Sequence, residues 1–177
     1  MLGAAGLVAV SVVVLAVLIL GSALLDRPSE TLESEVTVNA PVETVWQVVT
    51  NLEGYERWNP FVTRAAGDLR LGGELDLRLE LPDGETDEIT PEVVILRPDR
   101  KLRWQSHRVL PGVADREYEV ILEPLDGGRV LVFQQMRIEG ILAPLTDSGK
   151  EQAALDAMAS ALVEQVEQIA RGAPARE

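Results

Sequence analysis

Cysteine is absent from this chain of 177 residues. The protein therefore has no disulfide, no thiolate metal ligand, no cysteine nucleophile and no cysteine that could carry a lipid. Histidine occurs once, as His107. A metal site needs several ligands, and strand alternation turns His107 outward if Trp104 points inward. The sequence therefore predicts no metal site, no cofactor and no histidine-based catalytic group.

Basic side chains are also scarce. Lysine and arginine total 16 against 29 aspartates and glutamates, which gives a formal net charge of −13. Nucleic-acid binders carry basic patches, and adhesion to anionic lipid by charge alone needs clustered basic residues. The composition therefore argues against both.

Aromatic residues are few: three tryptophans, two tyrosines and two phenylalanines. Three of them, Tyr55, Trp58 and Phe61, fall in the short stretch "YERWNPF". Their spacing suits one side of a helical turn, and Pro60 disfavours helix at Asn59. Two interpretations remain open: these side chains plug a core, or they line the mouth of a cavity. For Trp58 in particular, both structural packing and ligand contact are kept.

Charged side chains are missing from residues 1–25. As a helix, residues 2–25 would be about 36 Å long, enough to cross about 30 Å of hydrocarbon. A cleaved signal peptide, with Gly21-Ser22-Ala23 as the cleavage site, is the alternative. Residues 1–25 lack the basic n-region of a signal peptide, and their apolar segment is longer than that of a signal peptide. The sequence predicts an uncleaved single-pass membrane anchor. Arg27, the one basic residue beside it, slightly favours a cytoplasmic position of the domain that follows.

Residues 26–33 are polar and indicate a spacer, and the tail is 172–177. Between them, residues 34–171 form the predicted domain. Residues 33–39 alternate like a strand, and two short helices are predicted at 41–50 and 52–58. Turn signals then divide residues 61–140 into about six strands. The clearest alternation places four leucines on one face: Leu75, Leu77, Leu79 and Leu81.

The last predicted element is a long helix over residues 148–170. It carries one apolar stripe made of Leu155, Met158, Leu162, Val166 and Ile169. This stripe must be buried, and the apolar face of the antiparallel sheet is the only large partner. The order of elements predicts an α+β domain in which the helix lies across a curved sheet. The space between them is a candidate cavity.

The stretch "VNAPVETVWQVVTNLEGYERWNPFV" is similar to the opening of the polyketide cyclase/dehydrase and lipid-transport family, within the START and Bet v 1-like (SRPBCC) superfamily. Further matches are "LRW" at 102–104, "LEP" at 122–124 and the run from Ile138 to Leu145. The resemblance covers residues 34 to about 170. It implies a helix-grip fold, with a seven-stranded antiparallel sheet around the C-terminal helix and an apolar cavity.

The sequence departs from the family pattern at two positions. Tyr118 stands where many members have a histidine, and Met136 stands where an acid is expected. If those groups serve chemistry in relatives, this chain has lost them. The departures favour a binding protein over an enzyme.

The predicted ligand-binding residues come from inward strand positions, from the aromatic stretch 55–61 and from the apolar stripe of the last helix. They are Trp58, Phe61, Leu77, Leu79, Trp104, Ser106, Tyr118, Val120, Val132, Gln134, Met136, Leu155, Met158 and Leu162. Gln134 either pairs with another buried polar group or faces the cavity. Asp87 and Glu88 lie in a strand of uncertain register, and either could turn inward as an acid or base.

Three functions are compatible with these observations. The favoured one is a monomeric, membrane-tethered binding or carrier domain for a small apolar or lipid-like ligand, with no catalytic residue. The second is a cyclase or dehydratase that uses Tyr118 and Gln134 as hydrogen-bond donors. The third is a protein-interaction module without a ligand.

Overall fold

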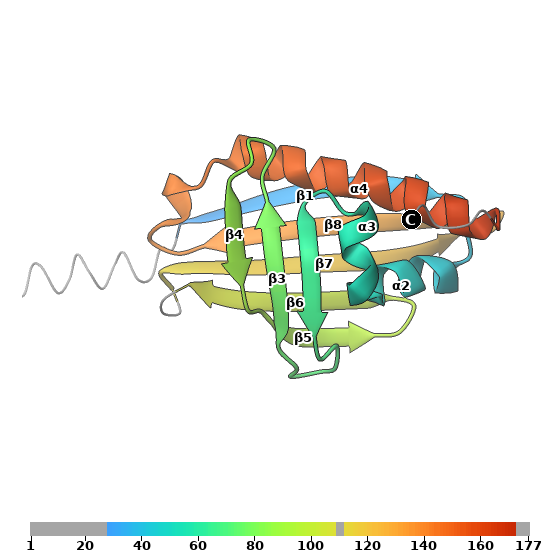
Figure 1. The fold of residues 1–177 in the computed structure, drawn as a ribbon, viewed down its shortest axis with the longest axis horizontal. Coiled ribbons are helices and arrows are strands. Elements are labelled where there is room, and N and C mark those ends of the chain that lie inside the picture. Colours follow the sequence, from blue (N-terminus) through green and yellow to red (C-terminus); the bar gives the residue numbers. More distant parts are fainter. Residues whose placement is uncertain (1–27, 109–111, 173–177) are drawn as a thin grey trace, which may run out of the picture.

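The long helix α4 (Ser148–Ala170) lies across an antiparallel sheet in the computed structural model, as the sequence predicts (Figure 1). The structure describes residues 28–108 and 112–172. Four members of the predicted helix stripe are buried: Leu155, Met158, Leu162 and Val166. Ile169 is 38% exposed, because it lies in the last turn of the helix, beyond the core cluster. The α+β class and the helix grip are therefore confirmed.

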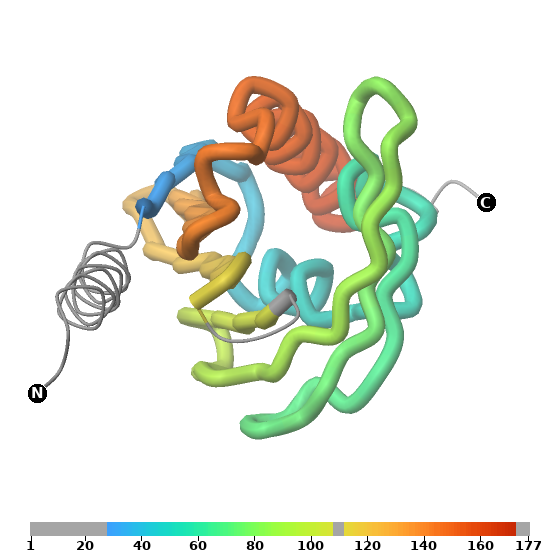
Figure 2. The backbone as a smooth tube through the Cα atoms, turned by 90° about the vertical axis from the view of Figure 1, so that its left-hand side faces the viewer, coloured from blue at the N-terminus to red at the C-terminus, as the bar shows by residue number. Residues whose placement is uncertain are grey.

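The prediction of a single seven-stranded sheet is wrong. The described residues contain eight strands in two sheets, one of five strands in the order β1-β8-β7-β6-β5 and one of three in the order β2-β3-β4. Both sheets curve around α4 (Figure 2). The strands are β1 (Ser29–Val38), β2 (Val62–Gly67), β3 (Leu75–Glu80), β4 (Thr86–Ile89), β5 (Glu92–Arg97), β6 (Lys101–Arg108), β7 (Ala114–Leu125) and β8 (Arg129–Glu139).

Pro91 explains the division into two sheets. It interrupts a stretch that otherwise has the pattern of one strand, so that β4 pairs with β3 while β5 pairs with β6. Proline has no N–H to continue a ladder, and its carbonyl accepts a hydrogen bond from the Leu75 N–H at 2.9 Å. A single bridge between Glu74 and Glu92 still joins the two sheets.

The first strand begins earlier than predicted. β1 starts at Ser29, opposite Glu139 of β8, so most of the predicted spacer 26–33 is part of the sheet. β1 is an edge strand with one face in solvent, so it contains few apolar residues and its sequence resembles a spacer. Only residues 26–28 separate the predicted anchor from the sheet.

The predicted short helices are present as α2 (Val42–Thr50), the 3₁₀ turn η1 (Leu52–Gly54) and α3 (Tyr55–Trp58). After α3 the side chain of Asn59, itself buried, accepts hydrogen bonds from the backbone N–H groups of Phe61 and Val62, at 3.0 and 2.8 Å. Phe61 is 2% exposed and fills the core. Tyr55 donates its hydroxyl to the Val49 carbonyl at 2.6 Å and meets Trp58 edge to face. The aromatic side chains of residues 55–61 therefore contribute to the packing of the core.

The predicted membrane anchor, residues 1–25, lies outside the described residues. Within 28–108 and 112–172, no helix has the length and apolar character that crossing a membrane requires.

Replacement of a stripe residue should lower the free energy of unfolding strongly. Leu162 is 2% exposed, and Leu162→Ala should cost about 2–5 kcal/mol through lost burial and a residual cavity. Ile169→Ala, on the exposed last turn of the same helix, is the matched control and should cost much less. Urea unfolding of both variants measures the difference. Equal losses would show that the stripe is not the buried face of α4.

Candidate functional site

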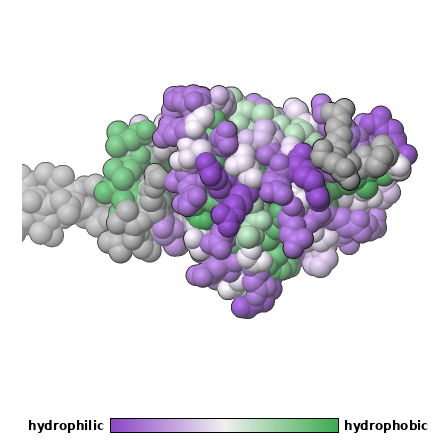
Figure 3. Space-filling model, viewed as in Figure 1, coloured by the Kyte–Doolittle hydropathy of each residue, from purple (hydrophilic) through white to green (hydrophobic). Residues whose placement is uncertain are grey.

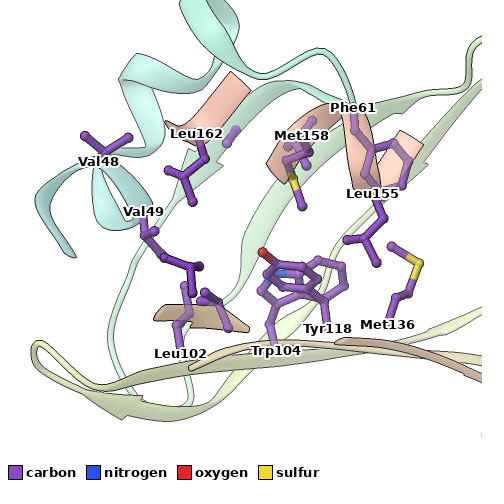
Figure 4. Packing of buried hydrophobic residues seen from close by; sticks show 14 of the residues in the cluster. Val48, Val49, Phe61, Leu102, Trp104, Tyr118, Met136, Leu155, Met158 and Leu162 are labelled. Atoms are coloured by element: carbon purple, nitrogen blue, oxygen red, sulfur yellow. The ribbon is translucent and has the colours of Figure 1, made fainter. Parts of the chain in front are cut away.

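The space beneath the middle of α4 is filled by side chains. Trp104 stacks on Tyr118 with ring centroids 5.3 Å apart, below Met158 and Leu155 of the helix (Figure 4). The void that remains here is about 20 Å³, roughly the space of one water molecule. The middle of the grip is therefore core, and the room for a ligand lies elsewhere.

One polar pair is buried in this core and forms an internal hydrogen bond. Tyr118 donates its hydroxyl to Oε1 of Gln134 at 2.7 Å, and burial raises the pKa of Tyr118 well above its ordinary value. Of the two interpretations of Gln134, pairing with a buried polar group is therefore the one observed. The Nε2 group of Gln134 has no hydrogen-bond partner among the described residues.

The structure distributes the predicted ligand-binding residues over several places. Phe61, Leu79 and Ser106 line a large cavity, and Trp58 lies beside a separate surface hollow. Phe61, Leu77, Trp104, Tyr118 and Met158 surround the small void. The others are buried in the core and line none of these three spaces: Val120, Val132, Gln134, Met136, Leu155 and Leu162. A ligand contact by any of the predicted residues stays a prediction.

The large cavity has a volume of about 770 Å³ and lies at the N-terminal end of α4. Its walls are the β3–β4 hairpin, strands β6 and β7, the end of β8 and the segment around the 3₁₀ turn η2 (Ala143–Leu145). Figure 2 looks at this end of the molecule. Eight apolar side chains line it: Phe61, Leu79, Leu81, Ile89, Ala114, Ile138, Leu142 and Leu145.

A cluster of charged side chains occupies the other part of the lining. Arg116 stands between Ser106 and Ile138 in a row across β6, β7 and β8, so these three side chains share the inner face of the sheet. Its guanidinium donates to Oε1 of Glu151 on α4 at 2.6 Å. It also lies 4.0 Å from Oδ2 of Asp87 on β4. Arg116 thus connects three elements around the cavity.

Glu151 is the buried member of this cluster, at 2% exposure. Burial raises the pKa of its carboxyl above the ordinary value of 4.5, and Arg116 counteracts part of that effect. Its second oxygen, Oε2, is buried without a hydrogen-bond partner among the described residues. An unpaired buried oxygen lowers the stability of the fold.

Pairing between β3 and β4 decides between the two uncertain acids. Asp87 stands directly opposite the buried Leu79, and Glu88 stands opposite Arg78. Residues directly opposite in a ladder share a face, so Asp87 belongs to the inner face. The sequence allowed either acid to turn inward. The register places Asp87 on the inner face, while the exposed Glu88 also borders the cavity.

The rim of the cavity is also charged. Lys150 reaches across to Asp83 in the β3–β4 turn, with Nζ 2.6 Å from Oδ2. His107 has its Nδ1 2.9 Å from Oδ1 of Asp115, and the other carboxylate oxygen, Oδ2, accepts a hydrogen bond from the Gly112 N–H at 2.8 Å. His107 is exposed, as predicted, but at the rim rather than on a remote surface.

Sequence reasoning missed Arg116 and Glu151. A signal for Glu151 was present, because it precedes Leu155 by four residues and therefore continues the buried stripe of α4. An acid in line with such a stripe needs a partner. The chain separates Arg116 from it by 35 residues, and no local pattern connects the two.

Comparisons with known proteins agree with this architecture. A sequence profile of the family described as polyketide cyclase / dehydrase and lipid transport matches residues 29–173. No curated protein matches the chain. A START superfamily protein from Mycobacterium smegmatis is 22% identical, with a TM-score of 0.64 over 78% of this chain and 98% of its own.

Two further solved structures show the same fold. A major latex-like protein of ginseng, Panax ginseng, has a TM-score of 0.63 at 9% identity, over 77% of this chain and 96% of its own. The di-domain ARO/CYC protein StfQ from the steffimycin biosynthetic pathway has a TM-score of 0.60 at 15% identity, over 81% of this chain and 51% of its own. At these identities the likeness concerns the fold and not the activity.

The buried Glu151 carboxyl should make stability depend on pH. Since its pKa is raised by folding, its contribution is fully present below the ordinary value of 4.5 and is lost as pH rises through the raised value. Glu151→Gln keeps the shape but cannot ionise. Its stability relative to the unmodified protein should therefore improve between about pH 5 and about pH 8.

Urea unfolding at the two pH values measures this change. The control is Glu164→Gln, on an exposed position of the same helix, whose effect should be the same at both. A stability difference for Glu151→Gln that is constant with pH would contradict the raised pKa.

Proposed function

Because this chain belongs to the polyketide cyclase / dehydrase and lipid-transport family, we propose that its domain binds a small lipid-like molecule in the 770 Å³ cavity at the N-terminal end of α4. We further propose that residues 1–25 tether the domain to a membrane. The observation that carries the binding proposal is the cavity itself, which joins an apolar wall to a buried charged cluster. Its volume falls within the roughly 300–1,000 Å³ of small-molecule sites.

The lining separates into two chemical parts that suit an amphipathic ligand. Apolar side chains from β3, β4, β7 and β8, with Phe61 at the inner end, would cover a hydrocarbon or ring system. Arg116, Glu151 and Asp87 would meet a polar head. The ligand is therefore not expected to be purely apolar, since covering these charged side chains with hydrocarbon alone would remove them from water without a compensating partner.

The charges that line the cavity favour some polar head groups of a ligand over others. Five carboxylates line the cavity, namely Glu85, Asp87, Glu88, Asp147 and Glu151, against the two basic side chains Arg116 and Lys150. Arg116 already pairs with Glu151, and Lys150 already pairs with Asp83. An anionic head would meet like charges, which is unfavourable. A neutral hydrogen-bonding head or a cationic amine fits this surface better than a phosphate or a carboxylate.

A cyclase-type enzyme is the second candidate, and Glu151 is the observation that favours it. A buried carboxyl with a raised pKa is suited to donate a proton. The same residue lines a cavity large enough for a substrate. If turnover of a bound compound is found, Glu151→Gln should abolish the turnover while the compound still binds. Binding without turnover supports the carrier function.

A bulky side chain in the cavity should block binding. Ala114 lies in the cavity lining and is only partly buried, so Ala114→Trp has room to project into the space. Affinity for an environment-sensitive apolar dye should fall at least about tenfold, or ~1.4 kcal/mol. The matched control is Ala66→Trp, at a partly buried alanine of β2 that does not line this cavity. Equal affinities for all three proteins would place the ligand elsewhere.

A competition experiment tests which polar head group the cavity prefers. A long-chain alcohol, an amine and a carboxylic acid of equal chain length compete for the bound dye. The alcohol and the amine should displace it at lower concentration than the acid at neutral pH, because the lining carries an excess of carboxylates. Preferred binding of the acid would show that Arg116 and Lys150 dominate recognition.

A further inference from the structure

Three large apolar side chains project from the end of the molecule where the cavity lies. Ile141 is 51% exposed, Leu142 is 41% exposed and Leu145 is 80% exposed. We refer to these three residues as the apolar tip. Figure 3 shows a hydrophobic patch at this end of a surface that is otherwise largely hydrophilic. Leu142 and Leu145 also line the cavity, so the apolar tip forms part of its mouth.

Backbone hydrogen bonds hold the apolar tip in a fixed shape. The N–H groups of Ile141 and Leu142 donate to the carbonyls of Gly112 and Val113, at 3.3 and 3.0 Å, and the Leu145 N–H donates to the Leu142 carbonyl at 3.0 Å. Gly140, before the tip, has φ +120, and a Cβ there would lie 2.5 Å from the Val113 carbonyl oxygen. The exposure of these side chains is thus built into the turn.

The start of the described chain lies against the same turn. The Gly140 N–H donates to the Pro28 carbonyl at 3.0 Å, immediately before the apolar tip. Three residues lead from Leu25, the last residue of the predicted anchor, to Pro28. Three extended residues span about 10 Å at most. An anchor ending at Leu25 therefore holds Pro28, and with it the apolar tip, close to the membrane surface.

We propose that the apolar tip inserts into the surface of the lipid bilayer, so that the cavity mouth opens directly onto the membrane. This inference rests on the proposed tether of residues 1–25. Attachment through a short link makes docking an intramolecular event with a high effective concentration, so a small apolar surface suffices. The acidic domain, with Asp83 and Glu85 in the β3–β4 turn near the mouth, implies that insertion depends on apolar contact and not on anionic lipid.

Because the chain contains no cysteine, an introduced cysteine is the single site at which a thiol-reactive label attaches. In full-length protein reconstituted into phosphatidylcholine vesicles, Leu145→Cys is labelled with an environment-sensitive fluorophore. The matched control is Leu125→Cys, at another exposed leucine, 37% exposed, which pairs with Arg129 at the far end of β8. Ten residues of strand separate Arg129 from Glu139, or about 33 Å. Phospholipids that carry a shallow quencher should quench the label at the tip several-fold more than the control label.

A second substitution checks the apolar contact. Leu142→Asp in the Leu145→Cys protein should reduce the quenching toward the control level, without a change in thermal unfolding. Leu71→Asp, at an exposed leucine in the β2–β3 connection, should not reduce it. Addition of phosphatidylserine to the vesicles should not increase the quenching.

Each remaining outcome contradicts the proposal in a recognisable way. Equal, weak quenching at both positions of a vesicle-bound protein would mean that the tether holds but the tip does not dock. A label at Leu145 that is shielded from aqueous quencher but not reached by lipid quencher would mean that protein covers the tip. Release of the full-length protein from vesicles by alkaline carbonate would instead refute the tether in the proposed function.

Discussion

The pair between Arg116 and Glu151 marks the place where the core of this domain ends. On its C-terminal side, α4 presents Leu155, Met158, Leu162 and Val166 to the sheet, and side chains fill the space almost completely. At Glu151 the same helix face carries a carboxylate. A buried charge needs its partner and polar surroundings, so close apolar packing stops there. The cavity begins at this transition, bounded by the charged pair and the last apolar residues of the sheet.

Gln134 is another buried polar residue on the inner face, and it lies where the core is closely packed. Gln134 accepts the Tyr118 hydroxyl within the core, and Trp104 covers Tyr118. This hydrogen bond joins the two side chains within a packed core, where the void that remains is only about 20 Å³. Glu151, by contrast, is one of the residues that line the large cavity. Room for a ligand therefore lies beside Glu151 at the N-terminal end of α4, and not along the helix beside Gln134.

Local periodicity was sufficient to predict α4, the leucine face of β3 and the inner faces of β6, β7 and β8, since each depends only on neighbours in sequence. The position of the cavity was not predictable in this way. It depends on the register between β3 and β4, which turns Asp87 inward, and on a contact between Arg116 and Glu151 from distant elements. Pro91, as a proline within a strand pattern, was the available signal for the split sheet. The first residues of β1, 29–32, offered none, because their low apolar content resembles that of a spacer.

The early start of β1 changes what a membrane anchor would do. With a flexible spacer, the domain could present any face to the bilayer, and an anchor would only raise its local concentration. Ser29 is already paired to Glu139, so the sheet would fix the direction in which the chain leaves an anchor. The strand, the Gly140 turn and the N-terminal end of α4 all meet at this end. A ligand with a hydrocarbon body would then pass between bilayer and cavity past Leu142 and Leu145 with little contact with water. An uncharged or cationic head would follow it toward Glu151 and Asp87 without opposing the acidic lining.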